Sequence, residues 1–372
     1  MEKFVVAFAV FTFCTIVIAV MSIIAMKQNP EVTSSCSMSD YLKTMTSYIS
    51  HKGVKKIEEE LPGRCLRDKQ YPEEVKKFRL ALTNIMQTCN SIRRDIRKTI
   101  QEPILTLFTS VDPDPKHNEV TVRTLQNWGS FMPYINIVMF TNDSRIKKQS
   151  RDHGWTVFPV MSVGVEGIPV LKAMFQKVIQ NFSTPYYGFA NGDILFTETI
   201  LESMLAARKY FNHDENVMLT GRRINVPHLT NKELVSYKFM EKAAKERGNL
   251  FVISSEDYFI TTKHFPWHSI PNFVIGRPAY DNWLVAHARC NHIKVVDMTN
   301  SILAIHQTTE TGNKNGHAHS SANYNDALLV SINAPRDYVK GFITCPEWYS
   351  YENLCGDIEI ARRTNIPPSC KC

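Results

Sequence analysis

The sequence predicts an α/β protein built around a parallel sheet, and two observations support this fold class. From about Ile104 onward, short runs of apolar, β-branched and aromatic residues alternate with helical patterns, which is typical of parallel sheets. Hydrophobic residues make up 44% of the chain and charged residues 21%. This balance is that of a globular protein, and it excludes a disordered, collagen-like or multi-span protein for the bulk of the 372 residues.

The expected strands are short apolar runs, most of them followed by polar residues or glycine. They are 104–109, 135–141, 155–158, 186–190, 194–196, 217–220, 295–299 and 303–307. Helices are expected around 120–131, at 170–181 and at 282–290, where apolar residues recur every three or four positions. Ligands of such sheets bind at the carboxyl ends of the strands. Thr109, Thr141-Asn142-Asp143 and Asn191-Gly192-Asp193 are therefore the first places to look for chemistry.

The apolar run Phe4–Met26 predicts an uncleaved membrane anchor. Its 23 residues include only three polar ones, Thr12, Thr15 and Ser22. As a helix the run would be about 35 Å long, enough to cross a hydrocarbon core of about 30 Å. A cleaved signal peptide is the alternative, but its apolar stretch is normally roughly 7–15 residues long and ends at small residues.

The cysteines favour an oxidising compartment. Cys14 lies in the apolar run, and the other eight are Cys36, Cys65, Cys89, Cys290, Cys345, Cys355, Cys370 and Cys372. An even number outside the run fits disulfides. A zinc site is the alternative, but no Cys-x-x-Cys occurs. Because the last four cysteines crowd a segment that also contains proline, we expect at least one disulfide there.

Residues 28–101 predict a polar linker followed by a helical stem. The charged residues of the stem form a solvated face, because the acidic run Glu58-Glu59-Glu60 is interleaved with basic residues. This pattern argues against nucleic-acid binding, in spite of a net charge of +7. Asn142 and Asn181 each begin an acceptor sequence for N-glycosylation and are candidate glycosylation sites.

Two motifs at strand ends suggest a site for an anionic ligand. Asp193 directly follows an apolar strand, where a carboxylate can hold a divalent cation that bridges two phosphates. The alternative for Asn191-Gly192-Asp193 is a simple hairpin turn. Arg222 and Arg223 follow the run 217–220, and two cations at a strand end suit an anion. The alternative for this pair is a surface turn.

Two later residues are candidates for acid–base or ligand roles. Asp281 lies among Tyr280, Trp283 and Leu284, and a desolvated carboxylate among aromatic residues has a raised pKa that suits a general base. Its alternative role is the N-cap of the helix at 282–290. His306 stands at the end of a strand, where it could bind a metal ion or a phosphate, or serve only a structural role.

Together these motifs resemble the nucleotide-sugar-dependent glycosyltransferases of the GT-A fold. The residues that carry the resemblance are Phe140–Asp143, Asn191–Thr197, Gly221–Arg223, Ile275–Leu284 and Ala304–Gln307. The resemblance covers about 104–319 and implies a Rossmann-type mixed sheet flanked by helices. The apolar run and stem resemble those of Golgi type II enzymes. This implies a single-pass type II membrane protein in the Golgi or ER lumen, with a secreted protein as the alternative.

The resemblance also implies roles for individual residues. Asp193 and His306 would hold a divalent cation, Mn²⁺ or Mg²⁺, although Asn191 stands where the Asp-x-Asp motif of the family has its first acid. Asp281 would be the catalytic base of an inverting reaction. The nucleotide-sugar-binding residues would be Thr109, Asn142, Asp143, Asn191, Arg222, Arg223 and Arg277.

The expected partners follow from this resemblance. They are a nucleotide-sugar donor, a glycan, protein or lipid acceptor, and the membrane through the N-terminal helix, but no nucleic acid. The predicted organisation is an anchor at 1–27, a stem at 28–101, a catalytic domain at 102–340 and a cysteine-rich tail at 341–372. Two other classes compete: a catalytically silent glycan-binding or matrix protein, favoured by the missing acid, and a metal-dependent hydrolase.

Overall fold

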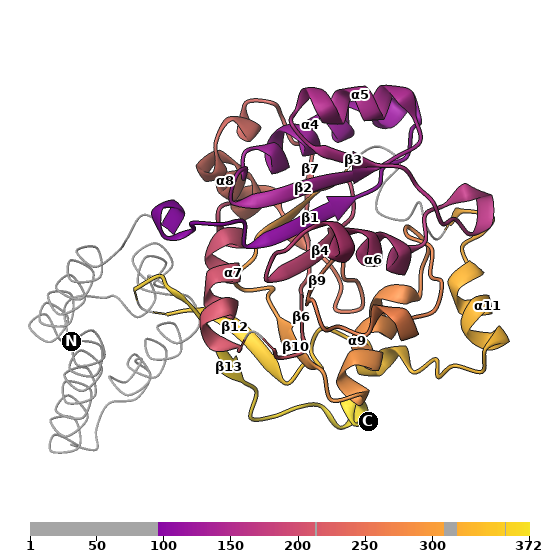
Figure 1. Cartoon of the computed structure of the whole chain (residues 1–372). Helices are drawn as coiled ribbons and strands as arrows, with labels where there is room; N and C mark the ends of the chain where they lie inside the picture. Colours follow the sequence, from indigo (N-terminus) through magenta and orange to yellow (C-terminus); the bar gives the residue numbers. More distant parts are fainter. Residues whose placement is uncertain (1–95, 213, 309–317, 354) are drawn as a thin grey trace, which may run out of the picture. The chain divides into compact units, whose positions relative to one another are not determined.

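A nine-stranded mixed sheet forms the centre of the fold in the computed structural model, which describes residues 96–212, 214–308, 318–353 and 355–372 (Figure 1). The strand order is β13-β12-β10-β6-β9-β4-β1-β2-β3. The strands are β1 Leu105–Thr109, β2 Ile135–Phe140, β3 Thr156–Phe158, β4 Tyr186–Ala190, β6 Val217–Thr220, β9 Tyr258–Thr262, β10 Lys294–Asp297, β12 Trp348–Glu352 and β13 Ile358–Arg362. Pairs are parallel except that β9 runs antiparallel to β4 and β6, and β13 antiparallel to β12.

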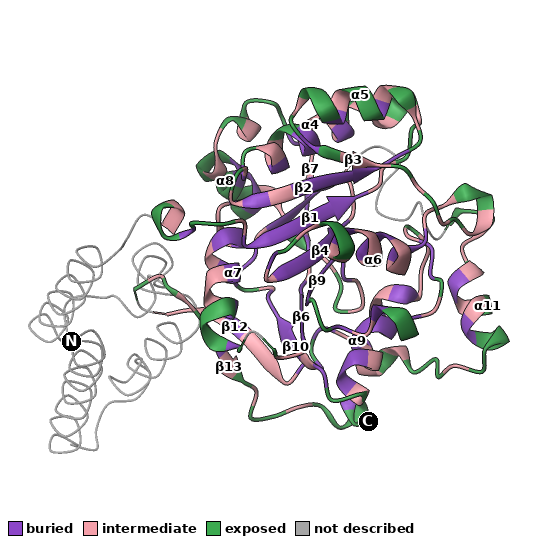
Figure 2. Cartoon of the chain, in the orientation of Figure 1, coloured by how far each residue is buried: buried purple, intermediate pink, exposed green. Residues whose placement is uncertain are grey.

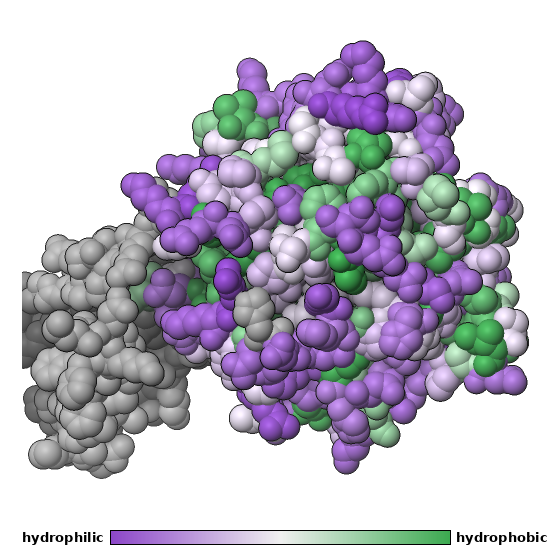
Figure 3. All heavy atoms as spheres, in the orientation of Figure 1, coloured by the Kyte–Doolittle hydropathy of each residue, from purple (hydrophilic) through white to green (hydrophobic). Residues whose placement is uncertain are grey.

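Helices cover both faces of this sheet. On one face lie α4 Asn118–Gly129, α5 Ser144–Asp152 and α7 Thr199–Tyr210, and on the other α6 Leu171–Asn181, α9 Tyr280–Cys290 and α11 Tyr324–Ser331. Neighbouring strand residues alternate between the two cores: Leu107 packs in the first and Phe108 in the second. Figure 2 shows the buried strands between helices whose outer faces are exposed. On the face in Figure 3, apolar side chains form separate groups among polar ones.

A second, four-stranded sheet lies in the order β5-β11-β7-β8. Its strands are β5 Ile194–Phe196, β7 Ile224–Pro227, β8 Asn249–Leu250 and β11 Ala304–Thr308, and α8 Tyr237–Arg247 packs on it through a third apolar cluster. Short 3-10 turns occur at Ile96–Thr99, Pro115–His117, Val165–Gly167, Glu233–Val235, Trp267–Ser269, Tyr338–Gly341 and Pro368–Cys370.

The predicted fold class, an α/β mixed sheet flanked by helices, is confirmed. The eight expected strands all occur, within one or two residues of the expected bounds. The strand–helix alternation indicated the parallel part of the sheet only, and β9 is inserted antiparallel between β4 and β6. The hairpin alternative for 191–193 is also wrong, because β4 and β5 belong to different sheets.

The expected disulfide in the C-terminal segment is confirmed. Cys290 pairs with Cys372, and Cys345 pairs with Cys370, each with a Cα–Cα distance of 5.3 Å. In the same segment β12 and β13 extend the main sheet beside β10. The C-terminal segment is thus bonded covalently to the end of α9 through Cys290 and hydrogen-bonded to the edge of the sheet through β12.

The predicted localisation, a single-pass type II membrane protein in the Golgi or ER lumen, is corrected. In the part of the chain that the structure describes, no helix is long and apolar enough to cross a membrane. The helices α4 and α7 have 12 residues each, whereas a span of the hydrocarbon core takes about 20. The run Phe4–Met26 and the stem, on which the prediction rested, lie outside the described residues.

Candidate active site at the carboxyl edge of the central strands

The turn between β4 and β5 brings Asp193 to the carboxyl edge of the sheet. Helix α4 holds this turn: Thr124 Oγ1 donates to the carbonyl oxygen of Gly192 at 2.7 Å, and the indole nitrogen of Trp128 donates to that of Ile194 at 2.8 Å. A Cβ atom at Gly192 would lie 2.3 Å from a methyl group of Val111, so this close approach requires glycine.

Asp193 and His306 form the pair predicted to hold a cation. His306 Nε2 lies 3.0 Å from Asp193 Oδ2, and the backbone N–H of Gln307 donates to the carbonyl oxygen of Asp193 at 3.1 Å, which fixes β11 against the turn. The side chain of Asp193 is 38% exposed, while its Oδ1 atom is buried and has no hydrogen-bond partner. Desolvation opposes ionisation, but the neighbouring charges of His306 and Arg223 hold the pKa of Asp193 below its usual range.

Asp257, just before β9, lies directly beside this pair. Its Oδ1 atom accepts a hydrogen bond from Asn191 Nδ2 at 2.8 Å and forms an ion pair with Arg223. Its Oδ2 atom is buried and has no partner. Burial and the charge of Asp193 raise the pKa of Asp257, against the opposing effect of Arg223. Asn191 therefore holds a carboxylate that lies directly before a neighbouring strand.

Glu256 lies next to Asp281. Its Oε2 atom accepts a hydrogen bond from Asn282 Nδ2 at 2.9 Å, while its Oε1 atom is buried without a partner. Desolvation, together with the charges of Asp281 and Asp257, raises the pKa of Glu256 well above its usual value.

Asp281 lies in the first turn of α9. The helix begins at Tyr280 with Ala279 as its N-cap, so the alternative that Asp281 caps the helix is wrong. Ala279 has a φ of 86°, and this left-handed turn leads the chain into α9. Desolvation and the charge of Asp257 raise the pKa of Asp281 to about 7, although backbone N–H groups of the helix start oppose the shift. A carboxylate with this pKa can accept a proton near neutral pH.

The two arginines that were expected to bind an anion both have protein partners. Arg223 is buried, ion-paired with Asp257, and its guanidinium lies 4.2 Å from the ring centroid of Phe251. Arg222 Nε donates to the carbonyl oxygen of Phe251 at 2.6 Å. The backbone at Gly221 packs so tightly that a Cβ atom there would lie 2.2 Å from the hydroxyl of Tyr258. Both side chains contribute positive charge to the edge of the sheet from fixed positions.

Other predicted residues are engaged in local structure. Thr109 is fully buried at the end of β1, beside Gly192. Asp143 caps α5 by accepting from the N–H of Ile146 at 2.8 Å. The side-chain amide of Asn142 exchanges hydrogen bonds with the backbone of Val160 at 3.0 and 3.1 Å.

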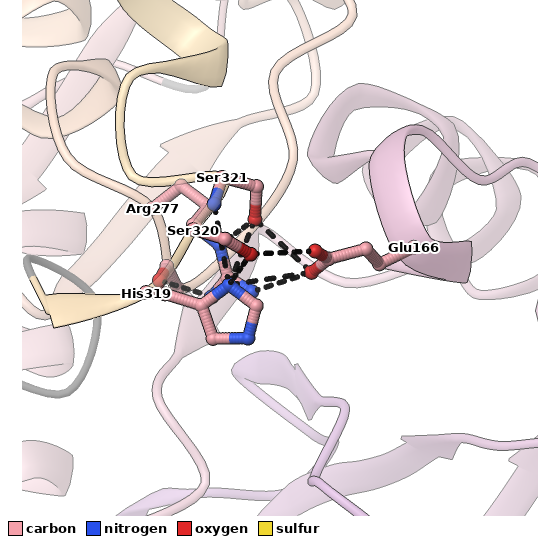
Figure 4. Close-up of polar contacts among 6 residues, drawn as sticks. Glu166, Arg277, His319, Ser320 and Ser321 are labelled. Atoms are coloured by element: carbon pink, nitrogen blue, oxygen red, sulfur yellow. Dashed lines mark hydrogen bonds and ion pairs between the residues drawn. The ribbon is translucent and has the colours of Figure 1, made fainter.

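Arg277 belongs to a separate polar cluster (Figure 4). Its guanidinium donates to Ser321 Oγ at 2.8 Å and lies 3.3 Å from Glu166 Oε2. His319 and Ser320 also contact Glu166, at 3.3 and 3.2 Å. The cluster connects the segment before α9 with the segments around 166 and 320.

The candidate glycosylation sites differ in their surroundings. Asn181 is the exposed last residue of α6, and its Nδ2 atom donates to the carbonyl oxygen of Lys177 at 2.7 Å. Asn142 is exposed as well, and its side-chain amide both donates to and accepts from the backbone of Val160.

Asp193 and His306 are of the residue types that hold a divalent cation whose other coordination positions are filled by a bound substrate. Among the described residues, no group of three His, Cys, Asp or Glu side chains could hold a metal ion. Asp193 and His306 nonetheless face each other, and Asp193 Oδ1 lacks a partner. Mg²⁺ and related ions are commonly held by one or two protein ligands together with substrate phosphates. The chain thus offers two ligands to an ion that a diphosphate would share.

Glu256 and Asp257 were not among the site residues predicted from the sequence. Their signal was two acidic residues directly before the apolar run Tyr258–Thr262, which was not recognised as a strand. Because β9 is antiparallel, its amino end lies at the edge where its neighbours β4 and β6 end. An acid pair before an antiparallel strand therefore reaches the same site as an acid after a parallel one.

Comparisons with known proteins give structural neighbours only. No protein-family model matches the chain, and no curated protein matches it. Similar solved structures include glucosyl-3-phosphoglycerate synthase from Mycobacterium tuberculosis with Mg²⁺ and UDP, at 11% identity and a TM-score of 0.37, over 65% of this chain and 83% of that one. The same enzyme with Mn²⁺, UDP and glucosyl-3-phosphoglycerate aligns at 10% identity and a TM-score of 0.39, over 65% and 84% of the two chains. Because these TM-scores are below 0.5, the functional interpretation rests on the residues of the site itself.

Proposed function

We propose that the protein is a glycosyltransferase that moves a sugar from a nucleotide-sugar donor to an acceptor hydroxyl. The observation that carries the proposal is the pair of Asp193, which is partly exposed, and the buried His306, set at the same sheet edge as Asp281 with its pKa of about 7. The first feature suits a diphosphate-bound cation, and the second suits proton abstraction from a hydroxyl group. The two disulfides favour an oxidising compartment for this activity.

Each residue has a defined task in this proposal. Asp193 and His306 would hold Mn²⁺ or Mg²⁺, which when bound supplies positive charge to the departing diphosphate. Arg222 and Arg223 add fixed positive charge at the same edge. In an inverting reaction, Asp281 takes the proton of the acceptor hydroxyl as its oxygen bonds to the anomeric carbon and the bond from that carbon to the phosphate oxygen breaks.

The test is a binding screen of the full chain against UDP, GDP and CMP, each with and without Mn²⁺. We expect one nucleotide to bind, and to bind more tightly when Mn²⁺ is present. Absence of binding for all three would contradict the proposal and favour the silent glycan-binding protein. If a sugar nucleotide binds and is only hydrolysed, without transfer to any acceptor, the hydrolase class is favoured.

A further inference from the structure

Two adjacent buried carboxyl groups, Glu256 and Asp257, link the cation pair to Asp281. Asp257 is hydrogen-bonded to Asn191, two residues before Asp193, at 2.8 Å. Glu256 is hydrogen-bonded to Asn282, directly after Asp281, at 2.9 Å. Consecutive residues therefore reach from one half of the proposed active site to the other.

Each of these carboxyl groups keeps one oxygen without a partner. Glu256 is 2% exposed and Asp257 4% exposed, and the unpaired atoms are Glu256 Oε1 and Asp257 Oδ2. A buried polar atom without a hydrogen bond destabilises the folded state, so such atoms are uncommon unless a ligand or a water molecule supplies the missing hydrogen bond. The other oxygen of each group accepts a hydrogen bond from a neighbouring side chain, which fixes the orientation of the carboxyl group.

The positions of Glu256 and Asp257 indicate which ligand would form hydrogen bonds with their unpaired oxygens. In the proposed reaction, the transferred sugar lies between the cation-bound diphosphate and the base, because its anomeric carbon must contact both the leaving oxygen and the acceptor. Asp257 interacts electrostatically with both Asp193 and Asp281, and Glu256 with Asp281. The two carboxyl groups thus lie between the cation pair and Asp281, where the proposed reaction places the transferred sugar.

We infer that Glu256 and Asp257 form a subsite that binds hydroxyl groups of the transferred sugar, and that they determine which sugar is accepted. This inference rests on the proposed function. Asp257 Oδ2 accepts a hydrogen bond from one hydroxyl, and Glu256 Oε1 exchanges one with another. A site that places buried polar groups against substrate hydroxyls rejects analogues that lack them, because those groups are then left unpaired.

The experiment compares each sugar nucleotide with its own nucleoside diphosphate, with Mn²⁺ present, by calorimetry on the full chain. UDP-glucose, UDP-galactose and GDP-mannose are the probes. Asp257→Asn and Glu256→Gln each keep an oxygen for the existing hydrogen bonds and replace the free oxygen by an N–H donor. We expect each substitution to weaken sugar-nucleotide binding by about 10- to 100-fold, while the diphosphate alone binds at least as tightly as it does to the unaltered chain, because Asp257→Asn removes the carboxylate that neutralises Arg223.

A matched control separates this effect from loss of a buried ion pair. Glu347→Gln removes the partner of Arg289, a buried arginine at the other end of α9, and should leave both affinities unchanged. Glu256→Gln keeps the test valid if Asp257→Asn fails to fold. Equal weakening of the sugar nucleotide and of the diphosphate would overturn the inference and assign Asp257 to the cation. If neither ligand binds the unaltered chain, the proposed function itself fails.

Discussion

At the scale of single residues, Asp193 is the side chain on which cation-dependent binding depends most. Its carboxylate faces His306 at 3.0 Å and retains one unpaired oxygen. Asp193→Asn replaces a negative charge by a neutral amide, so we expect nucleotide affinity in the presence of Mn²⁺ to fall by about 10- to 100-fold. Affinity without Mn²⁺ should stay the same. Titration calorimetry with and without the metal ion measures both.

The matched control is Asp152→Asn on α5, whose carboxylate pairs with Lys148 on the protein surface. This substitution removes the same charge from an exposed pair and should leave nucleotide binding unchanged. The role of Asp193 as a cation ligand is refuted if Asp193→Asn binds Mn²⁺ and nucleotide as tightly as the control does.

Asp281 should determine the pH dependence of turnover. Its pKa of about 7 means that it is protonated, and inactive as a base, below neutral pH. We therefore expect kcat/KM to rise with pH up to about 7 and then to level off. Asp281→Asn should bind donor normally but lose a factor of roughly 10²–10⁴ in rate, as expected on removal of a general base.

Stability shows whether the Asp281→Asn variant is intact. Because the pKa is raised in the folded state, ionisation of Asp281 costs folding free energy, and this cost is fully present above about pH 7. Asp281→Asn should therefore be at least as stable as the unaltered protein at pH 8, and the difference should shrink as the pH falls. A flat pH profile, or an undiminished rate in the variant, would exclude Asp281 as the base. A small effect here beside a large one at Asp193 would indicate a retaining reaction.

At the scale of elements, α11 positions the start of α9 through one buried side chain. Asn325 accepts from the N–H of Val274 at 3.0 Å and donates to the carbonyl oxygens of Val274 and Arg277 at 3.0 and 3.1 Å. Asn325→Ala would leave these buried backbone groups unpaired, so we expect a loss of about 2–4 kcal/mol in unfolding free energy. Turnover should also fall more than nucleotide affinity does, because the segment leads into Asp281.

The control for this prediction is Asn323→Ala, two residues earlier in the chain. Asn323 is exposed and makes no side-chain cap on α11. Urea denaturation should find it within about 0.5 kcal/mol of the unaltered protein, as is usual for surface substitutions. If Asn325→Ala is equally harmless, α11 does not position the start of α9.

The elements also show how far the sequence predicts this fold. Strands β1, β2 and β4 are apolar runs buried on both faces, which is the pattern of a central parallel strand, and they were expected correctly. Strand β9 is equally buried, but no local signal distinguishes an antiparallel strand inserted by tertiary pairing from a parallel one. Prediction of the site residues was limited in the same way, because the local sequence does not show which strands pair. Asp193 and Asp281 stand at recognisable element ends, and His306 lies in the middle of the expected strand β11, whereas the approach of Asp257 to Asn191 depends on the strand order.

At the scale of the whole molecule, two disulfides tie the C-terminal segment to the fold. The Cys290–Cys372 bridge closes a segment with a sequence separation of 82, and Cys345–Cys370 one of 25. In the chain-entropy estimate, the longer loop stabilises the folded state by about 4.5 kcal/mol and the shorter by about 3.5 kcal/mol. The enclosed segment includes β10 to β13, and thus His306 on β11.

We therefore expect the double variant Cys290→Ser with Cys372→Ser to lose more stability than Cys345→Ser with Cys370→Ser. Urea denaturation of both variants measures the difference, and peptide mapping without reductant checks the pairing. Arg289 supports the same attachment, since its guanidinium donates to the carbonyl oxygens of Lys340 at 2.6 Å and Cys370 at 3.1 Å. These hydrogen bonds should hold the segment near α9 even without the bridge, so the longer-loop variant should unfold at lower urea concentration and still bind nucleotide below its transition. Equal stability of both variants and the unaltered protein, or free thiols at all four positions, would show that the bridges do not hold this segment.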